Sequence, residues 1–179
     1  MTMSVDEALR ERRSIRAYLD RDVPEDLIRQ MIEAATFAPS AKNGQQWRFT
    51  VLTGDSKLEF TRLYRSELDK LGYDFGSSYG SCQMMEKVPV VIIVWNTNER
   101  GWTTEAHGVA AATQNLLLKA HSLGLGACWI GDIFYAYESI MNHFKKPWKL
   151  LAAITVGWPR VIPRMKPRLS VDEVTEFFN

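Results

Sequence analysis

VPVVIIVW, at residues 88–95, is the longest apolar run of the chain. Its β-branched residues favour a strand, and the run is apolar on both of the faces that a strand presents. Strands of this kind lie inside sheets that are covered on each side by helices. The run is far shorter than the roughly 20 residues needed to span a bilayer. We therefore expect a buried central strand and no association with a membrane.

The segment that follows, Thr104 to Leu123, predicts a helix that is apolar over most of its surface. Lys119 is its only formally charged residue between Ala106 and Ala120, so the helix has to be covered all round. Either the core of one domain covers it or a second subunit does. We favour a homodimer interface, because small side chains allow another backbone to approach closely. These small residues are Ala106, Gly108, Ala110, Ala111 and Ala112.

The remaining elements do not alternate strictly between strand and helix, because two helices precede the first strand. A capping box at Ser4–Glu7 begins the first helix, and Pro24 stands at the first turn of the second. This order predicts an α+β fold, a mixed central β-sheet flanked by helices, in a single domain over residues 1–179. We expect strands at 47–53, 127–131 and 150–156, helices at 58–71 and 135–144, and a loop rich in Gly, Ser and aromatic residues at 72–81.

The end of the chain predicts an extended arm over residues 160–179. Pro159, Pro163 and Pro167 recur at every fourth position, which prevents a regular helix. Ser170 and Glu173 then form a second capping box, which begins a last short helix. An arm of this length is suited to wrapping around another surface.

Basic residues gather in two windows near opposite ends of the chain, although its net charge is only +1. Two readings are open: both windows are solvated surface, or they converge on one phosphate, which the planar fork of Arg binds well. A nucleic-acid ligand is disfavoured by the near-neutral chain and by the lack of aromatic residues between the basic ones. The windows are Arg10, Arg12, Arg13 and Arg16, and then Arg160, Arg164, Lys166 and Arg168.

Within the first window, an extended chain of period two places Arg12, Ser14 and Arg16 on one side. Two guanidinium groups and a hydroxyl would then face the same ligand. This combination suits a molecule that carries both a phosphate and sugar-like hydroxyl groups.

Other kinds of site are not supported by the sequence. Cys82 and Cys128 belong to no CxxC pair, and the three histidines lie in no known ligand spacing. We therefore expect no metal site, no disulfide and two reduced thiols. The polar start of the chain, MTMSVDEALR, has no apolar leader, so we expect a cytoplasmic protein.

Four segments together resemble the nitroreductase family of FMN-dependent oxidoreductases. They are RRSIRAY (12–18), APSAKNGQQWRF (38–49), GLGACWIGDI (124–133) and RMKPRL (164–169). Each segment alone would be weak evidence, but their order and spacing also agree. The resemblance runs from about residue 7 to residue 169. It implies an intertwined homodimer that holds FMN at the subunit interface.

The resemblance also assigns roles to individual residues. It implies that Arg12, Ser14, Lys166 and Arg168 hold the flavin phosphate and ribityl chain, with Arg13 lining the same strip. Arg16 would lie nearer the ring, and the backbone at Ile130 and Gly131 would pass beside N5. The segment that reaches the flavin from the other subunit would be Pro39, Ser40, Ala41, Asn43 and Gln45.

The flavin itself carries hydride, so the resemblance implies no catalytic side chain. We expect His107 and Cys128 to be structural. Many family members carry Glu where this chain has Gly131, which predicts a less acidic edge of the pocket. The aromatic residues of two loops are candidates to stack on a flat substrate or to pack in the core; they are Tyr73, Phe75, Tyr79, Phe134, Tyr135 and Tyr137.

The implied function is hydride transfer from NADH or NADPH through flavin N5 to a small electron-poor acceptor, such as a nitroaromatic, a quinone or an enone, by a ping-pong mechanism. The alternative is a module that stores or senses flavin without turning over a substrate.

Overall fold

The computed structural model describes residues 3–72, 76–97 and 103–178. It contains a four-stranded sheet in the order β1-β2-β4-β3, formed by β1 (Trp47–Thr53), β2 (Val90–Asn96), β4 (Lys149–Gly157) and β3 (Gly126–Ile130). The apolar run supplies the inner strand β2, and each of its residues is buried. The predicted central strand is therefore confirmed.

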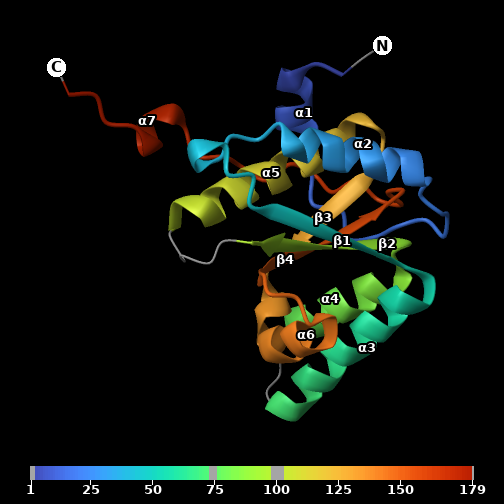
Figure 1. The fold of residues 1–179 in the computed structure, drawn as a ribbon. Helices are drawn as coiled ribbons and strands as arrows, with labels where there is room; N and C mark the ends of the chain where they lie inside the picture. Colours follow the sequence, from blue (N-terminus) through green and yellow to red (C-terminus); the bar gives the residue numbers. More distant parts are fainter. Residues whose placement is uncertain (1–2, 73–75, 98–102, 179) are drawn as a thin grey trace.

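Alternation along β2 divides the core into two layers. Val90, Ile92 and Val94 belong to the layer covered by α2 (Glu25–Thr36) and α5 (Thr103–Ser122). Val91, Ile93 and Trp95 belong to the opposite layer. Figure 1 shows α3 (Gly54–Leu71), α4 (Gly76–Lys87) and α6 (Tyr137–Phe144) on that second face of the sheet.

The α+β class is confirmed, with helices on both faces of the sheet. All three pairs among the four strands are antiparallel. Over the described residues, the parallel component of the expected mixed sheet is limited to one bridge, between Ser14 and Ala127.

The predicted helix starts are present as well. α1 (Val5–Glu11) and the terminal α7 (Val171–Val174) each begin with a complete capping box, at Ser4 and Ser170. Two short 3-10 helices are present: η1 (Ala41–Asn43) precedes β1, and η2 (Asp132–Ala136) follows β3. In the described part of the chain, no helix has both the length and the apolar content that crossing a membrane requires.

The expected loop at 72–81 is wrong over the residues that the structure describes. Gly76 to Lys87 form the helix α4, in which Ser78, Ser81 and Cys82 are buried. Small polar side chains face the core here, so the sequence lacks the apolar stripe by which a helix is usually recognised. Tyr73 and Phe75 lie outside the described residues.

α5 packs on the sheet, on α2 and on α1, but a single chain does not cover it all round. Val109, Ala112 and Leu116 are buried against the sheet, whereas Ala110 and Ala111 remain half-buried. The helix that we expected to be covered all round thus keeps an accessible face of small residues.

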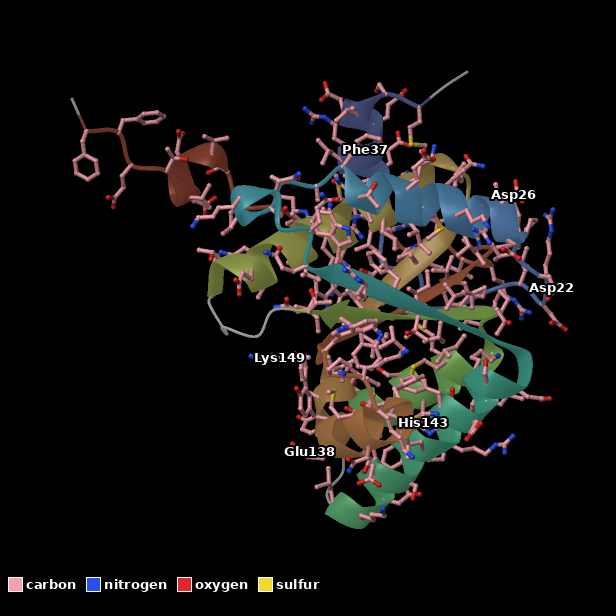
Figure 2. The ribbon with its side chains drawn as sticks, in the orientation of Figure 1. Asp22, Asp26, Phe37, Glu138, His143 and Lys149 are labelled. Carbon is pink, nitrogen blue, oxygen red and sulfur yellow. The ribbon has the colours of Figure 1, made fainter. Side chains whose placement is uncertain are left out.

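Beyond β4 the chain leaves the body as the predicted extended arm. Residues 160–178 are exposed throughout, and the side chains of the terminal part project clear of the body in Figure 2. The exposed apolar side chains of the arm are Val161, Ile162, Met165, Leu169, Val171, Val174, Phe177 and Phe178.

Candidate functional site

The first basic window is held in an extended form between β3 and the beginning of the arm. The Ile15 N–H donates to the Ala127 carbonyl at 3.0 Å, and the Arg160 N–H donates to the Ala17 carbonyl at 2.9 Å. Gly126 makes the approach to β3 possible, because an added Cβ would stand 2.6 Å from Ile15 Cγ1. These contacts bring the two ends of the chain together.

Arg12 and Arg168 are close enough to influence each other. The pKa of Arg12 is lowered, chiefly by burial and then by the positive charges of Arg168 and Arg13. Neither Arg12 nor Arg168 has a carboxylate partner within 4.0 Å among the described residues. Two guanidinium groups that repel each other without a counter-charge favour an anionic ligand between them.

Lys166 and Arg168 lie along the first helix. They line a cavity of about 630 Å³ together with Leu9 and Arg10 of α1. The second basic window therefore contacts the first, and the reading of two unrelated solvated surfaces is not supported.

Arg13 differs from its neighbours in the same window. Its guanidinium donates to the backbone carbonyls of Arg10 at 2.6 Å and of Arg12 at 2.8 Å. Arg13 thus satisfies carbonyl groups at the carboxyl end of α1. Its place along a phosphate strip stays a prediction.

A second cavity, which we call the ring cavity, lies where Arg16 faces the end of β3. It has a volume of about 400 Å³, and Ser77, Gly80, Ser81 and Met84 of α4 form one of its walls. The structure thus brings together three of the predicted residues, Arg16, Ile130 and Gly131. The opposite wall is Cys128, Trp129, Ile130, Gly131 and Asp132.

Cys128 is buried in this wall. Burial raises the pKa of its thiol, although Arg16, Ser14 and Arg12 act in the opposite direction. The protonated thiol is a weak nucleophile, in agreement with the structural role that we expected.

Asp132 is a residue of the ring cavity that the sequence reasoning missed. Its Oδ2 accepts a hydrogen bond from Ser81 Oγ at 3.0 Å, whereas its buried Oδ1 has no partner. The less acidic pocket edge at Gly131 stays a prediction, although the next residue, Asp132, brings a carboxylate to the same wall. Its position directly after Gly131 was the signal that could have pointed to it.

The loop at 39–46 lies apart from both cavities in the same chain. It packs on α5, where an added Cβ at Gly108 would stand 3.3 Å from the Pro39 carbonyl oxygen. Lys42, Asn43 and Gln45 adopt positive φ angles of 52°, 53° and 47°, and strained backbone of this kind concentrates at functional sites. The loop lines neither the ring cavity nor the cavity beside Lys166. The predicted residues Pro39, Ser40, Ala41, Asn43 and Gln45 are thus separated from the others within one chain.

The remaining candidates have structural roles or lie outside the two cavities. Tyr79 packs against the core and donates to Asp69 at 2.7 Å, and Phe134 stacks on Tyr137 with ring centroids 6.1 Å apart. His107 is exposed and lines neither cavity. The described residues contain no cluster of His, Cys, Asp and Glu that could hold a metal ion.

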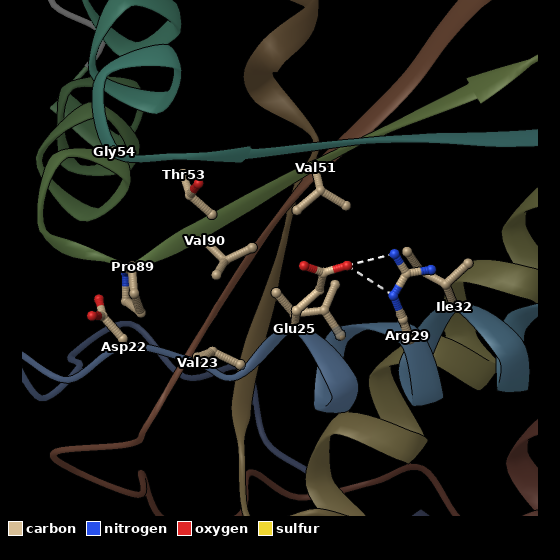
Figure 3. Close-up of a pocket in the computed structure, with 11 residues that line it drawn as sticks. Asp22, Val23, Glu25, Arg29, Ile32, Val51, Thr53, Gly54, Pro89 and Val90 are labelled. Atoms are coloured by element: carbon tan, nitrogen blue, oxygen red, sulfur yellow. Dashed lines mark hydrogen bonds and ion pairs between the residues drawn. The ribbon is translucent and has the colours of Figure 1, made fainter.

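A larger groove, about 750 Å³, lies between α2 and the edge strand β1 (Figure 3). Its side chains are mainly aliphatic, and Arg29 Nε donates to Glu25 at 2.8 Å within it. None of the predicted site residues lines this groove, so its size does not indicate where the chemistry occurs.

Comparison with known proteins agrees with this arrangement. The profile of the Nitroreductase family matches residues 9–158, which include Arg12 and Gly131 but not Lys166 or Arg168. A Methanothermobacter thermautotrophicus protein named as an NADH dehydrogenase/NAD(P)H nitroreductase is 34% identical over 178 residues, covering 96% of this chain and 86% of its own. A Bacillus subtilis protein named as an NAD(P)H nitroreductase, YfhC, is 29% identical over 94% of this chain and 91% of its own.

A solved structure shows the same fold. A nitroreductase from Desulfovibrio desulfuricans, described in complex with FMN, superimposes with a TM-score of 0.81 at 28% identity and covers the whole of both chains. The match of the family profile over most of the chain and the shared fold lead to one conclusion. This chain belongs to the nitroreductase family.

Proposed function

We propose that this chain is an FMN-dependent NAD(P)H oxidoreductase that acts as a homodimer and reduces a small electron-poor acceptor, such as a nitroaromatic, a quinone or an enone. The observation that carries the proposal is the convergence of Arg12 with Arg168, from opposite ends of the chain, at a place where Arg12 also acts on Cys128 in the wall of the ring cavity. The names of the relatives and the FMN complex of the structural neighbour support it.

The residues present fit FMN. Arg12 and Arg168 have no carboxylate partner among the described residues, and with Lys166 they offer charge-assisted donors to a phosphate. At Gly131 an added Cβ would meet nothing within 4 Å, so the backbone there borders open space. Asp132 also lines the ring cavity, although its partnerless Oδ1 is buried.

FMN, when bound, supplies hydride exchange at N5 between a nicotinamide and the acceptor, in two separate half-reactions. The protein would bind and orient the FMN and would stabilise the negative charge that forms on its reduction. Arg16 places a positive charge in the ring cavity, which stabilises negative charge that gathers there on reduction. Burial raises the pKa of the Cys128 thiol, and we assign it no role in the reaction.

The proposed second subunit would complete the site. Loop 39–46 carries strained backbone but lies apart from the ring cavity of its own chain, as expected if it serves the cavity of a partner. The half-buried face of α5 and the exposed apolar side chains of the arm offer surfaces for the same contact.

The proposed activity is tested by anaerobic titration of the purified protein with NADH and with NADPH. We expect a yellow protein whose flavin absorbance is bleached by at least one nicotinamide much faster than that of free FMN, and is restored when a nitroaromatic or quinone is added. A colourless protein that takes up no FMN would contradict the proposal. Bleaching no faster than that of free FMN would instead support a module that stores or senses flavin.

Removal of residues 169–179 is expected to weaken the dimer. The segment contains five exposed apolar side chains, and burying each is worth about 1.5–3 kcal/mol. We expect the dimer dissociation constant to rise at least about 100-fold, measured by analytical ultracentrifugation. The stability of the monomer should not change, because these residues are exposed in the isolated chain. Full-length Glu176→Gln, a polar change on the same arm, is the control; an unchanged dimer in the truncated protein would refute the role of the arm.

A further inference from the structure

The ring cavity adjoins a second, strongly charged hollow. A cavity of about 690 Å³, which we call the cationic annex, shares Arg16, Gly80 and Met84 with the ring cavity. Both volumes fall in the range of about 300–1,000 Å³ that small-molecule sites occupy. Because the two hollows meet at these three residues, an extended molecule that passes over them would reach both.

The cationic annex is lined by more positive than negative side chains. Five cations face three carboxylates, and Glu86, one of the three, is already paired with Arg65 at 2.9 Å. The other two carboxylates are Asp20 and Asp22. In the described part of the chain, none of the five cations has a carboxylate within 4.0 Å. The five are Arg16, Arg21, Lys57, Lys87 and Arg160.

Lys57 holds a fixed place at the base of this hollow. It is 8% exposed, and its Nζ donates to the carbonyls of Glu86 at 2.9 Å and of Val88 at 2.7 Å. An ammonium group has three donors, so one remains without a protein partner. Lys87 and Arg160, by contrast, are exposed at the rim and form no side-chain hydrogen bond within the described residues.

We propose that the cationic annex binds the 2′-phosphate of NADPH, and that it makes the protein selective for NADPH over NADH. The proposal rests on the proposed function, because it assigns the reductant of the same site. A dinucleotide whose nicotinamide enters the ring cavity passes Arg16 and extends into the annex. A phosphate monoester there meets five cations, none of which has a carboxylate within 4.0 Å among the described residues, and charge-assisted hydrogen bonds are the strong ones. NADH has no such group to offer.

The proposal is tested by direct binding to the full-length, FMN-loaded protein. The probes are 2′-phospho-ADP-ribose and ADP-ribose, which differ only in the 2′-phosphate and carry no nicotinamide. Isothermal titration calorimetry should give at least about tenfold tighter binding of the phosphorylated probe. Equal affinities for the two probes would overturn the proposal.

The matched variants place the effect at the rim. The double variant Lys87→Gln with Arg160→Gln should lose the preference for 2′-phospho-ADP-ribose over ADP-ribose, while its affinity for ADP-ribose changes less than about threefold. The charge-conserving double variant Lys87→Arg with Arg160→Lys should keep this preference. Arg29→Gln, which neutralises an exposed cation that lines the neighbouring groove of Figure 3 and not the annex, should also keep it. A preference that survives the loss of both rim charges would refute the annex as its source. Circular dichroism checks that each variant is folded.

The two proposals fail in different ways. If NADH and NADPH bleach the flavin equally fast and the two probes bind equally, the oxidoreductase stands and the annex is not a phosphate site. If the phosphorylated probe binds selectively but neither nicotinamide bleaches the flavin, the annex stands and the proposed reaction is wrong.

Discussion

The double variant Arg12→Gln with Arg168→Gln is expected to lose its bound FMN on purification. A hydrogen bond to a charged group contributes about 1.5–3 kcal/mol, so the removal of two should weaken FMN binding by roughly 10²–10⁴-fold. Each single variant should lose less. The measurement is fluorescence titration of the flavin-free protein with FMN, together with the absorbance of the purified protein.

Loss of fold does not explain this result, because the two charges repel each other in the flavin-free protein. The positive charge of Arg168 contributes to the lowered pKa of Arg12, so neutralising the pair relieves a repulsion. The flavin-free variant should unfold at a temperature equal to or above that of the unmodified flavin-free protein. Arg62→Gln, which neutralises an exposed arginine on α3, should retain FMN. If the double variant binds FMN normally, the two ends of the chain do not hold its phosphate.

Gly126→Ala is expected to destabilise the protein and to weaken FMN binding at the same time. The new Cβ would stand 2.6–2.8 Å from three carbons of Ile15, which is only 4% exposed. Overpacking of this kind costs typically about 1–3 kcal/mol. Relief requires the segment that carries Arg12, Ser14 and Arg16 to move away from β3, where the Ile15 N–H donates to Ala127. Urea denaturation and FMN titration measure the two effects.

A second substitution separates this clash from a general effect of alanine. In Gly126→Ala with Ile15→Ala, the contacts at 2.6 and 2.8 Å with the γ carbons are removed, whereas the contact at 2.7 Å with Cβ of residue 15 remains. The clash is therefore relieved in part, and the cost of the double variant should be less than the sum of the two single costs. Gly80→Ala is a control for stability alone, because Gly80 lines the ring cavity. An added Cβ on this helical residue meets nothing within 4 Å, so the substitution should stabilise the protein by about 0.4–1 kcal/mol. Full additivity of the double variant would contradict the proposed contact between residues 15 and 126.

Local patterns in the sequence predicted most of the fold. Three features depend on residues within a few positions of one another: the apolar run of β2, the two capping boxes and the arm with its regularly spaced prolines. Short-range preferences of this kind can be recognised in the sequence without knowledge of the fold. α4 was missed for the same reason. Its core-facing residues include Ser78 and Ser81, which are small and polar, and only the space available against the neighbouring elements makes them suitable there.

The candidate site divides in a similar way. Resemblance named Arg12, Arg16 and Gly131, because these positions lie in short recognisable motifs. Arg13 donates hydrogen bonds to carbonyls at the end of α1, and one oxygen of Asp132 has no partner among the described residues. Both facts depend on which groups lie within hydrogen-bond distance in the folded chain. No spacing along the chain records such distances.

By itself, then, the sequence determined which residues carry charge, where strands and helices begin, and that both ends of the chain are basic. Only the tertiary structure decided that these ends meet, that a carboxylate and a cationic hollow stand beside Arg16, and that loop 39–46 lies away from the ring cavity of its own chain. The physical reason is that contacts between residues about 110 positions apart, such as that of Ile15 on Gly126, depend on close packing, whereas local propensity acts over a few residues.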